Sequence, residues 1–165
     1  MALHGFCAYG KQGENGAGAC GTGVITGHHI IPDHCFHYCS GRGKESCVVI
    51  DGYTIDDAPV VLVTADANGG KSREHGTIHA VFDPLELKAQ LLEDSSNEWT
   101  YADARAAAVE SVHKCLGLAK ADIQKVLDDY FMTNLGMSTS TLLRAGEHGV
   151  MKHAPDPRRS KRQKA

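Results

Sequence analysis

The amino-acid sequence predicts an α+β domain, with loops and short strands in its N-terminal half and helices in its C-terminal half. Eight glycines and few large apolar side chains occupy residues 5–27, a composition typical of loops and extended chain. Short β-branched runs follow this segment, and helical spacing of apolar residues begins after residue 72. This division of the chain favours the α+β class.

The N-terminal elements are expected to be short. The sequence GVIT at 23–26 predicts a strand that ends at two adjacent histidines, His28 and His29. Two further apolar runs, each bounded by turn residues, indicate short strands at 47–50 and 59–64. Pro59 disfavours a central position in a sheet and suits a strand start or the first turn of a helix.

Helical patterns fill the second half of the chain, over residues 72–83, 84–94, 101–116 and about 120–134. Gly76 weakens the first of these helices by about 1 kcal/mol relative to alanine. Asp83 and Pro84 are typical of an N-cap and a first helical position, so we expect a new helix to begin there. Thr100 and Asp103 resemble a capping box at the start of the third helix.

Composition indicates a globular domain with a tail of opposite charge. The 165 residues are 42% hydrophobic and 22% charged, and no apolar run approaches the 18 residues of a membrane span. The first residues lack the features of a secretory signal. Residues 1–150 hold 11 basic and 19 acidic residues, a net charge of −8, whereas 151–165 hold six and one, a net of +5. We expect a glycine-rich arm or linker at 1–26, a domain at 27–150 and a basic, disordered tail at 151–165.

The six cysteines leave three interpretations open. Their spacing is irregular and contains no C-x-x-C, and a chain of this length does not need disulfides for stability. Reduced structural thiols are therefore the preferred interpretation, with one or two disulfides as the second. The third is a zinc site, which would have to be built around Cys35 and Cys39 with His34 and His37.

Two histidine motifs together indicate a metal site. His28 and His29 open an H-H-x-x-P sequence at a strand end, and His75 and His79 form an H-x-x-x-H at helical spacing. Residues four apart on a helix face the same way, so two imidazoles there can bind one divalent ion, and a third from the strand end would complete a site with open positions. The adjacent histidine could then act as a general base, since its pKa suits proton transfer at neutral pH.

This combination resembles the ββα-metal endonucleases, the HNH and endonuclease VII-like superfamily, over residues 27 to about 83. Within that superfamily, the sequence GHH at 27–29 is similar to the signature of nuclease domains of bacterial polymorphic toxins, often type VI secretion effectors. The resemblance implies a ββα-metal finger as the core of the α+β domain. It also implies an antibacterial hydrolase that enters a target bacterial cell and acts in its cytoplasm on DNA. Its cognate partner would be an immunity protein.

The resemblance also implies roles for individual residues. His28, His75 and His79 match the metal ligands, for one ion of magnesium, manganese, zinc or nickel, and His29 matches the general base. Asp57 stands where the family usually has an asparagine and would orient His29 or approach the metal. Basic residues form a further group of candidates, as nucleic-acid contacts: Arg42, Lys44, Arg73, Arg158, Arg159, Lys161 and Arg162.

Two other functions compete with the nuclease. A non-enzymatic zinc-binding interaction module would use a closed four-ligand site and show no cleavage. A metal hydrolase acting on another substrate, such as a protease, is disfavoured because the H-x-x-x-H motif lacks the glutamate of H-E-x-x-H. The P-C-x-x-C signature of zinc deaminases is also missing from the sequence.

Overall fold

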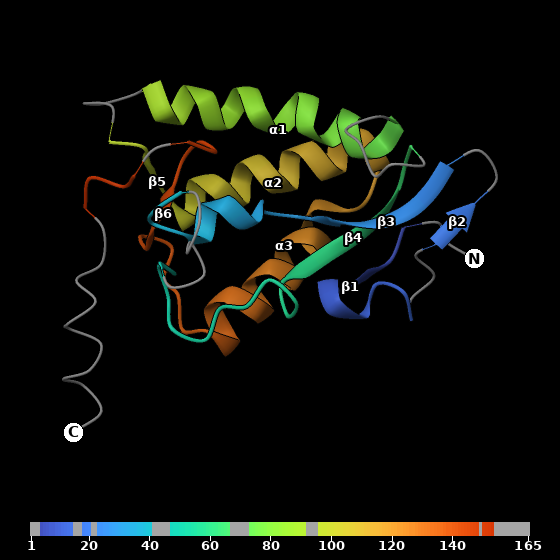
Figure 1. Ribbon diagram of the computed structural model, residues 1–165, viewed down its shortest axis with the longest axis horizontal. Coiled ribbons are helices and arrows are strands. Elements are labelled where there is room, and N and C mark those ends of the chain that lie inside the picture. Colours follow the sequence, from blue (N-terminus) through green and yellow to red (C-terminus); the bar gives the residue numbers. More distant parts are fainter. Residues whose placement is uncertain are drawn as a thin grey trace.

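The computed structural model describes residues 4–14, 18–20, 23–40, 47–66, 73–91, 96–148 and 150–153. Among these residues the fold is α+β, as the sequence predicts. A four-stranded antiparallel sheet and a separate two-stranded sheet pack with three α-helices (Figure 1). No helix in the described part of the chain is both long and apolar enough to span a bilayer.

The larger sheet has the strand order β1-β4-β3-β2. Its strands are β1 (Phe6–Ala8), β2 (Gly18–Cys20), β3 (Gly23–His29) and β4 (Pro59–Ala65). Strand β4 confirms the apolar run at 59–64, and Pro59 stands at its start. The strands described within the first 26 residues belong to this sheet and not to a separate arm, because β1 pairs with β4 and β2 pairs with β3. The predicted strand at 23–26 is longer than expected and includes both histidines.

The loop between β3 and β4 is held by a short 3-10 helix, η2 (Asp33–Phe36), and a disulfide between Cys39 and Cys47. The disulfide overturns the preferred interpretation of fully reduced thiols and takes Cys39 out of the proposed zinc site. The predicted strand at 47–50 is wrong, since its only ladder contact with described residues is an isolated bridge between His37 and Val48. The backbone there pairs with the η2 segment instead of joining the sheet.

Helix α1 (Arg73–Leu91) is continuous, so the predicted helix start at Asp83 and Pro84 is wrong. Its buried side chains Ile78, Phe82 and Glu86 are spaced at four-residue intervals across the expected break. One face of the helix is therefore anchored on both sides of Pro84, which lies on the exposed face. This packing offsets the cost of a proline inside a helix, about 3 kcal/mol.

The C-terminal helices agree with the sequence pattern. Helix α2 (Tyr101–Leu116) begins with the predicted capping box, in which Thr100 and Asp103 exchange hydrogen bonds. Helix α3 (Lys120–Asp128) continues into a π-helical turn, Asp129–Asn134. The sequence does not predict the small second sheet, in which β5 (Glu98–Thr100) pairs with β6 (Leu142–Arg144).

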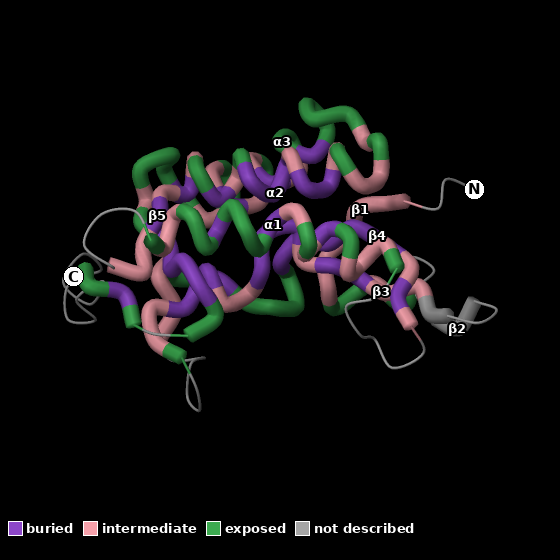
Figure 2. The backbone as a smooth tube through the Cα atoms, turned by 90° about the horizontal axis from the view of Figure 1, so that it is seen from above, coloured by how far each residue is buried: buried purple, intermediate pink, exposed green. Residues whose placement is uncertain are grey.

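The helices and the larger sheet enclose one continuous hydrophobic core. Helix α1 packs on β4 and along α2, and α2 packs on α3 (Figure 1). Buried backbone lies where these elements face one another, and much of α3 is exposed on its outer side (Figure 2). The Phe36 ring stacks on Tyr53 at 4.6 Å and on Phe131 at 4.5 Å, which fixes η2 to the core directly after the histidine strand.

Candidate metal centre

The adjacent histidines of β3 point to opposite faces of the sheet, as strand geometry requires. His28 lies opposite Val61 in the register and is 4% exposed. Val61 belongs to the core beneath α1, so His28 faces the helix. His29 lies opposite Val60, and its ring stacks on Tyr9 at 4.5 Å. The two imidazoles therefore have different neighbours although they are adjacent in sequence.

Three predicted ligands converge where β3 meets α1. His75 and His79 are four residues apart on the helix, and His28 approaches both from the strand. The ring centroid of His28 lies 4.8 Å from that of His75 and 5.0 Å from that of His79, and the two helical rings are 5.1 Å apart. One ring nitrogen from each lies within 4.8 Å of the other two. Three neutral imidazoles in this arrangement can hold a divalent ion and leave positions for water or substrate.

Asp83 orients one of these ligands. Its Oδ1 lies 2.9 Å from Nδ1 of His79, one helical turn earlier. A ring N–H at Nδ1 that donates to this carboxylate leaves the lone pair of Nε2 available to a metal, and such partners also raise the basicity of the ligand. The sequence pattern assigned Asp83 to a helix cap, so this role was missed.

The environment of His29 comes from two segments distant in sequence. Tyr9 belongs to a 3-10 turn, Tyr9–Lys11, whose backbone is fixed by a hydrogen bond from Tyr9 N to the Ala58 carbonyl at 3.0 Å. A ring nitrogen of His29 lies 3.4 Å from the carbonyl oxygen of Ile55. Sequence reasoning missed Tyr9, because a lone tyrosine in a glycine-rich segment carries no distinctive pattern.

Asp57 does not join the histidines. Its exposed carboxylate accepts a hydrogen bond from the Thr54 hydroxyl at 2.7 Å, and its backbone N–H donates to the same hydroxyl oxygen at 3.2 Å. The turn that contains Asp57 does reach the site, through the Ile55 carbonyl. The structure therefore supplies a backbone oxygen where the resemblance implies a side chain.

The histidines open into a cavity of about 260 Å³. It is lined by Tyr9, Thr26, Gly27, His28, His29, Pro32, Asp33, His75 and His79. Asp33 accepts hydrogen bonds from the Tyr53 hydroxyl at 2.9 Å and from Nε2 of His37 at 3.0 Å. Burial, followed by the charge of Asp33, raises the pKa of Tyr53, so this hydroxyl remains a donor. Asp33 thereby connects the cavity wall to the core, a role the sequence did not indicate.

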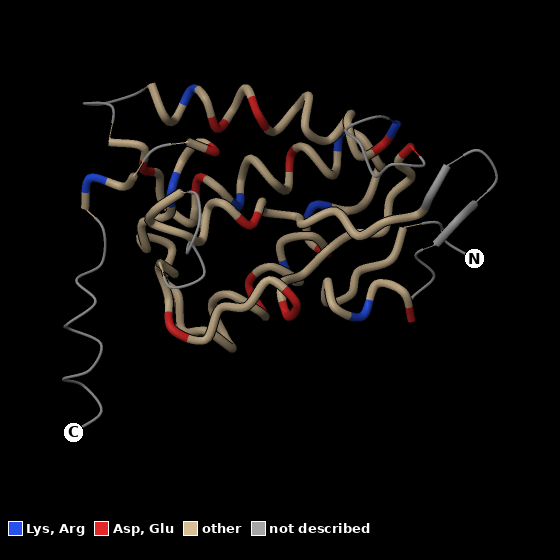
Figure 3. Tube along the Cα trace, in the orientation of Figure 1, with Lys and Arg blue, Asp and Glu red and all other residues tan. Residues whose placement is uncertain are grey.

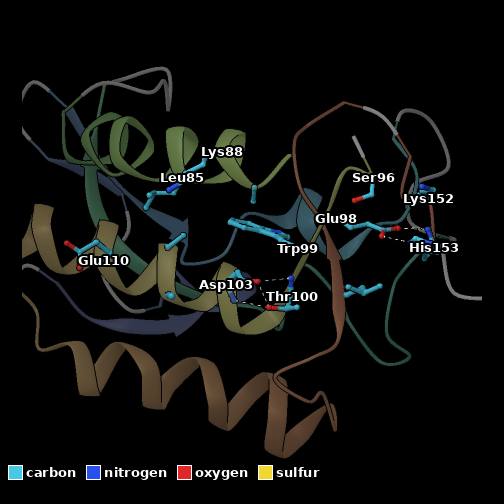
Figure 4. A pocket seen from close by; sticks show the side chains of 14 residues that line it. Leu85, Lys88, Ser96, Glu98, Trp99, Thr100, Asp103, Glu110, Lys152 and His153 are labelled. Carbon is cyan, nitrogen blue, oxygen red and sulfur yellow. Dashed lines mark hydrogen bonds and ion pairs between the residues drawn. The ribbon is translucent and has the colours of Figure 1, made fainter. Parts of the chain in front are cut away.

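A larger cavity, about 850 Å³, lies elsewhere, beside Trp99 and between α1 and α2 (Figure 4). None of the predicted site residues lines it. Glu98 faces His153 across one end, with 2.8 Å between a carboxylate oxygen and Nδ1. Its walls are mainly apolar and carry no cluster of metal ligands among the described residues.

Gly27 is required by close approach at the strand end. A Cβ at this position would lie 2.9 Å from Oε1 of Gln12 and 2.9 Å from Cγ2 of Val60. The Gln12 side chain also accepts a hydrogen bond from the Gly27 N–H. The glycine of the GHH sequence therefore lets the N-terminal segment pack directly beside the histidines.

Only one of the predicted nucleic-acid contacts lies in the described part of the chain. Arg73 is exposed and is the first residue of α1, two positions before His75. The other six candidates lie outside the described residues: Arg42, Lys44, Arg158, Arg159, Lys161 and Arg162.

No protein-family model, curated protein or solved structure matches this chain. The resemblance to the ββα-metal nucleases consequently stays a prediction based on the histidine motifs. The order β3, β4, α1 and the meeting of three imidazoles between strand and helix are compatible with it.

Proposed function

We propose that this protein is a metal-dependent endonuclease that hydrolyses phosphodiester bonds in DNA. The observation that carries the proposal is the convergence of His28, His75 and His79, with a fourth histidine lining the same cavity from separate contacts. The proposed ligands and the proposed base thus occupy different positions. A hydrolase needs both, whereas a closed structural zinc site needs only the ligands.

The three imidazoles of His28, His75 and His79 would hold one divalent ion, of magnesium, manganese, zinc or nickel. When bound, such an ion stabilises negative charge on the phosphate and on the leaving oxygen. His29 would accept the proton of the attacking water. If its ring N–H donates to the Ile55 carbonyl, the other ring nitrogen keeps its lone pair for that proton. The stacked Tyr9 ring restricts the orientation of this imidazole.

The start of α1 offers a place for the phosphate. Backbone N–H groups at a helix N-terminus favour anions, and Arg73 adds a positive charge there. His75 lies within the same first turn, so an anion at the helix end would be near the histidine cluster. This placement supports a phosphodiester as the substrate.

The biological setting follows from the GHH sequence alone. We propose an antibacterial toxin domain that is delivered into a target bacterial cell and acts in its cytoplasm. A cell that makes such a nuclease needs a cognate immunity protein. Expression of the chain alone in bacterial cytoplasm is expected to stop growth and degrade chromosomal DNA, and normal growth with soluble protein would contradict this setting.

The direct test is cleavage of supercoiled plasmid in the presence of each candidate ion, with chelator as the blank. His29→Ala is expected to abolish cleavage and leave metal affinity within a few fold, because His29 is not a ligand. His75→Ala is expected to lose both. Metal affinity is measured by isothermal titration calorimetry, and equal loss of affinity in the two variants would contradict the assignment of roles.

The competing function makes the opposite prediction for the same experiment. A non-enzymatic zinc-binding module, with its site closed by Cys35, Cys39 and nearby histidines, would bind zinc and leave the plasmid intact with every ion. The structure does not bring the residues of this zinc site together, because Cys39 is bonded to Cys47 and His37 lies against Asp33.

A further inference from the structure

We propose a second metal site, formed by His34, Cys35 and Glu86 and separate from the three-histidine cluster. These residues offer a nitrogen, a sulfur and an oxygen that all lie within 4.8 Å of one another. Nitrogen, thiolate and carboxylate ligands together suit zinc and related divalent transition ions. The inference does not depend on the proposed nuclease activity.

Two elements of the fold supply the ligands. His34 and Cys35 belong to η2, and Glu86 comes from the buried face of α1. Cys35 is fully buried and Glu86 is 6% exposed. The backbone that follows β6 also holds Glu86, since the Gly146 N–H donates to its Oε1 at 2.9 Å. An ion here would connect the loop after the histidine strand to the helix that carries His75 and His79.

The spacing of the three atoms is close to that of a tetrahedral site. Ligand atoms about 2.0–2.3 Å from zinc at tetrahedral angles are separated by roughly 3.3–3.6 Å. Sγ of Cys35 already lies 3.5 Å from Oε1 of Glu86. Nε2 of His34 is 2.6 Å from the same oxygen, a hydrogen-bond distance, so these two atoms must separate by less than an ångström. The imidazole is 20% exposed and has room to do so.

Charge also favours a divalent ion at this position. The ion would displace the S–H proton of Cys35 to solvent. The Nε2 proton of His34, which now faces the Glu86 carboxylate, would also be released to solvent, and a neutral imidazole with its proton on Nδ1 would offer the Nε2 lone pair to the ion. A thiolate and a carboxylate would balance the two positive charges of the ion. The buried Arg144 guanidinium adds one further positive charge beside these two ligands.

A fourth ligand can enter from solvent. His34 and Glu86 line a cavity of about 490 Å³, whose wall also includes Gly146, Glu147 and, on the side of the three-histidine cluster, His79 and Asp83. A water molecule in this cavity could complete a four-coordinate ion. The buried Arg144 beside the site does not line this cavity. Its guanidinium donates to the backbone carbonyls of His34 and Glu147.

Cobalt(II) distinguishes this site from the histidine cluster, because only a thiolate ligand gives an intense near-ultraviolet charge-transfer band. We titrate the protein with Co²⁺ in oxygen-free buffer without added thiol, so that the disulfide stays intact. The wild type is expected to show the band and to bind two ions per chain. Cys35→Ser is expected to lose the band and bind one ion.

Glu86→Gln is the second variant, because it preserves volume and removes the charged ligand. It is expected to weaken the band and lower Zn²⁺ affinity at least tenfold. Cys7→Ser and Cys115→Ser, at free thiols away from the cluster, should keep the band. His75→Ala should also keep it and lose only the other ion. A wild type without the band, or a band that Cys115→Ser removes, would overturn the second site whether or not the protein cleaves DNA.

Discussion

At the scale of single residues, the contact between Asp83 and His79 is the clearest case of one side chain setting the state of another. The carboxylate fixes which imidazole nitrogen carries the proton. Asp83→Ala is expected to lower metal affinity of the histidine cluster by about 10–100-fold, the usual effect of losing such a partner. Calorimetry with Mn²⁺ or Zn²⁺ measures the change.

The matched control for Asp83 removes a carboxylate far from the site. The Glu110 side chain on α2 is 45% exposed and pairs with Lys120, so Glu110→Ala changes net charge equally without touching a histidine of the cluster. An equal loss of affinity in both variants would mean that Asp83 acts through long-range charge and not by holding the ring.

Gly27 gives a second residue-scale prediction. A methyl group there meets Val60 and displaces the Gln12 side chain, so Gly27→Ala should lower the free energy of unfolding by about 1–3 kcal/mol, as overpacking usually does. It should also reduce metal binding, since β3 must shift beside His28. Denaturant unfolding and metal titration measure the two effects. Gly13→Ala is the control, because a Cβ at Gly13 has nothing within 4 Å, and a similar loss there would contradict the steric explanation.

Whether a residue of the site could be predicted depends on how far apart in sequence its contacts are. The convergence of the candidate ligands His28, His75 and His79 could be predicted because strand and helix periodicity place their side chains locally. Tyr9 and Asp33 could not, because their contacts depend on how distant segments pack. The role of Asp57 was inferred from its position in a motif, and the backbone of the turn occupies the place next to His29 instead.

At the scale of elements, Pro84 tests why α1 remains continuous. Proline cannot donate to the carbonyl of Ala80, and alanine at this exposed position would restore that hydrogen bond. Pro84→Ala should raise the free energy of unfolding by about 2 kcal/mol, because the gain of about 3 exceeds the lost rigidity of the unfolded chain. Urea unfolding measures it. The control is Lys88→Ala, at an exposed position on the same helix, which should change the free energy of unfolding by less than about 0.5 kcal/mol. If Pro84→Ala is less stable than the wild type, the proline ring itself contributes packing.

Elements with strong local patterns were predicted well. Helix α2 has both its capping box and its apolar face in sequence, and β4 is a buried β-branched run. The short strands β1, β5 and β6 have three residues each, too few for a periodicity to be recognised. They exist because a neighbouring strand is in place, which local sequence does not encode.

At the scale of the whole molecule, the N-terminal segment and the helical half depend on one another. Strand β1 lies against β4, and β4 contacts α1, so the glycine-rich start of the chain is part of the same packed body as the helices. Composition suggested a linker because glycine is rare in strand interiors. At Gly27 the absence of a side chain is what permits the packing.

The distribution of charge along the chain predicts which residues supply the affinity for DNA. Acidic residues occur on α1, α2 and α3 (Figure 3), and residues 1–150 carry a net charge of −8. Non-specific affinity should therefore come largely from the basic residues near the C-terminus: Arg158, Arg159, Lys161, Arg162 and Lys164. Removal of 154–165 retains the contact of His153 with Glu98.

Each neutralised phosphate contributes about 0.9 to the slope of log affinity against log salt, so three or four contacts from these side chains predict a slope about 3 smaller after truncation. Fluorescence anisotropy with a labelled duplex, from low to moderate salt, measures the slope. Replacing the five basic residues with glutamine retains chain length and should have the same effect. Cleavage at saturating DNA should change little, because the histidines are untouched. An unchanged slope in both variants would mean that the folded body supplies the phosphate contacts, with Arg73 as the first candidate to test.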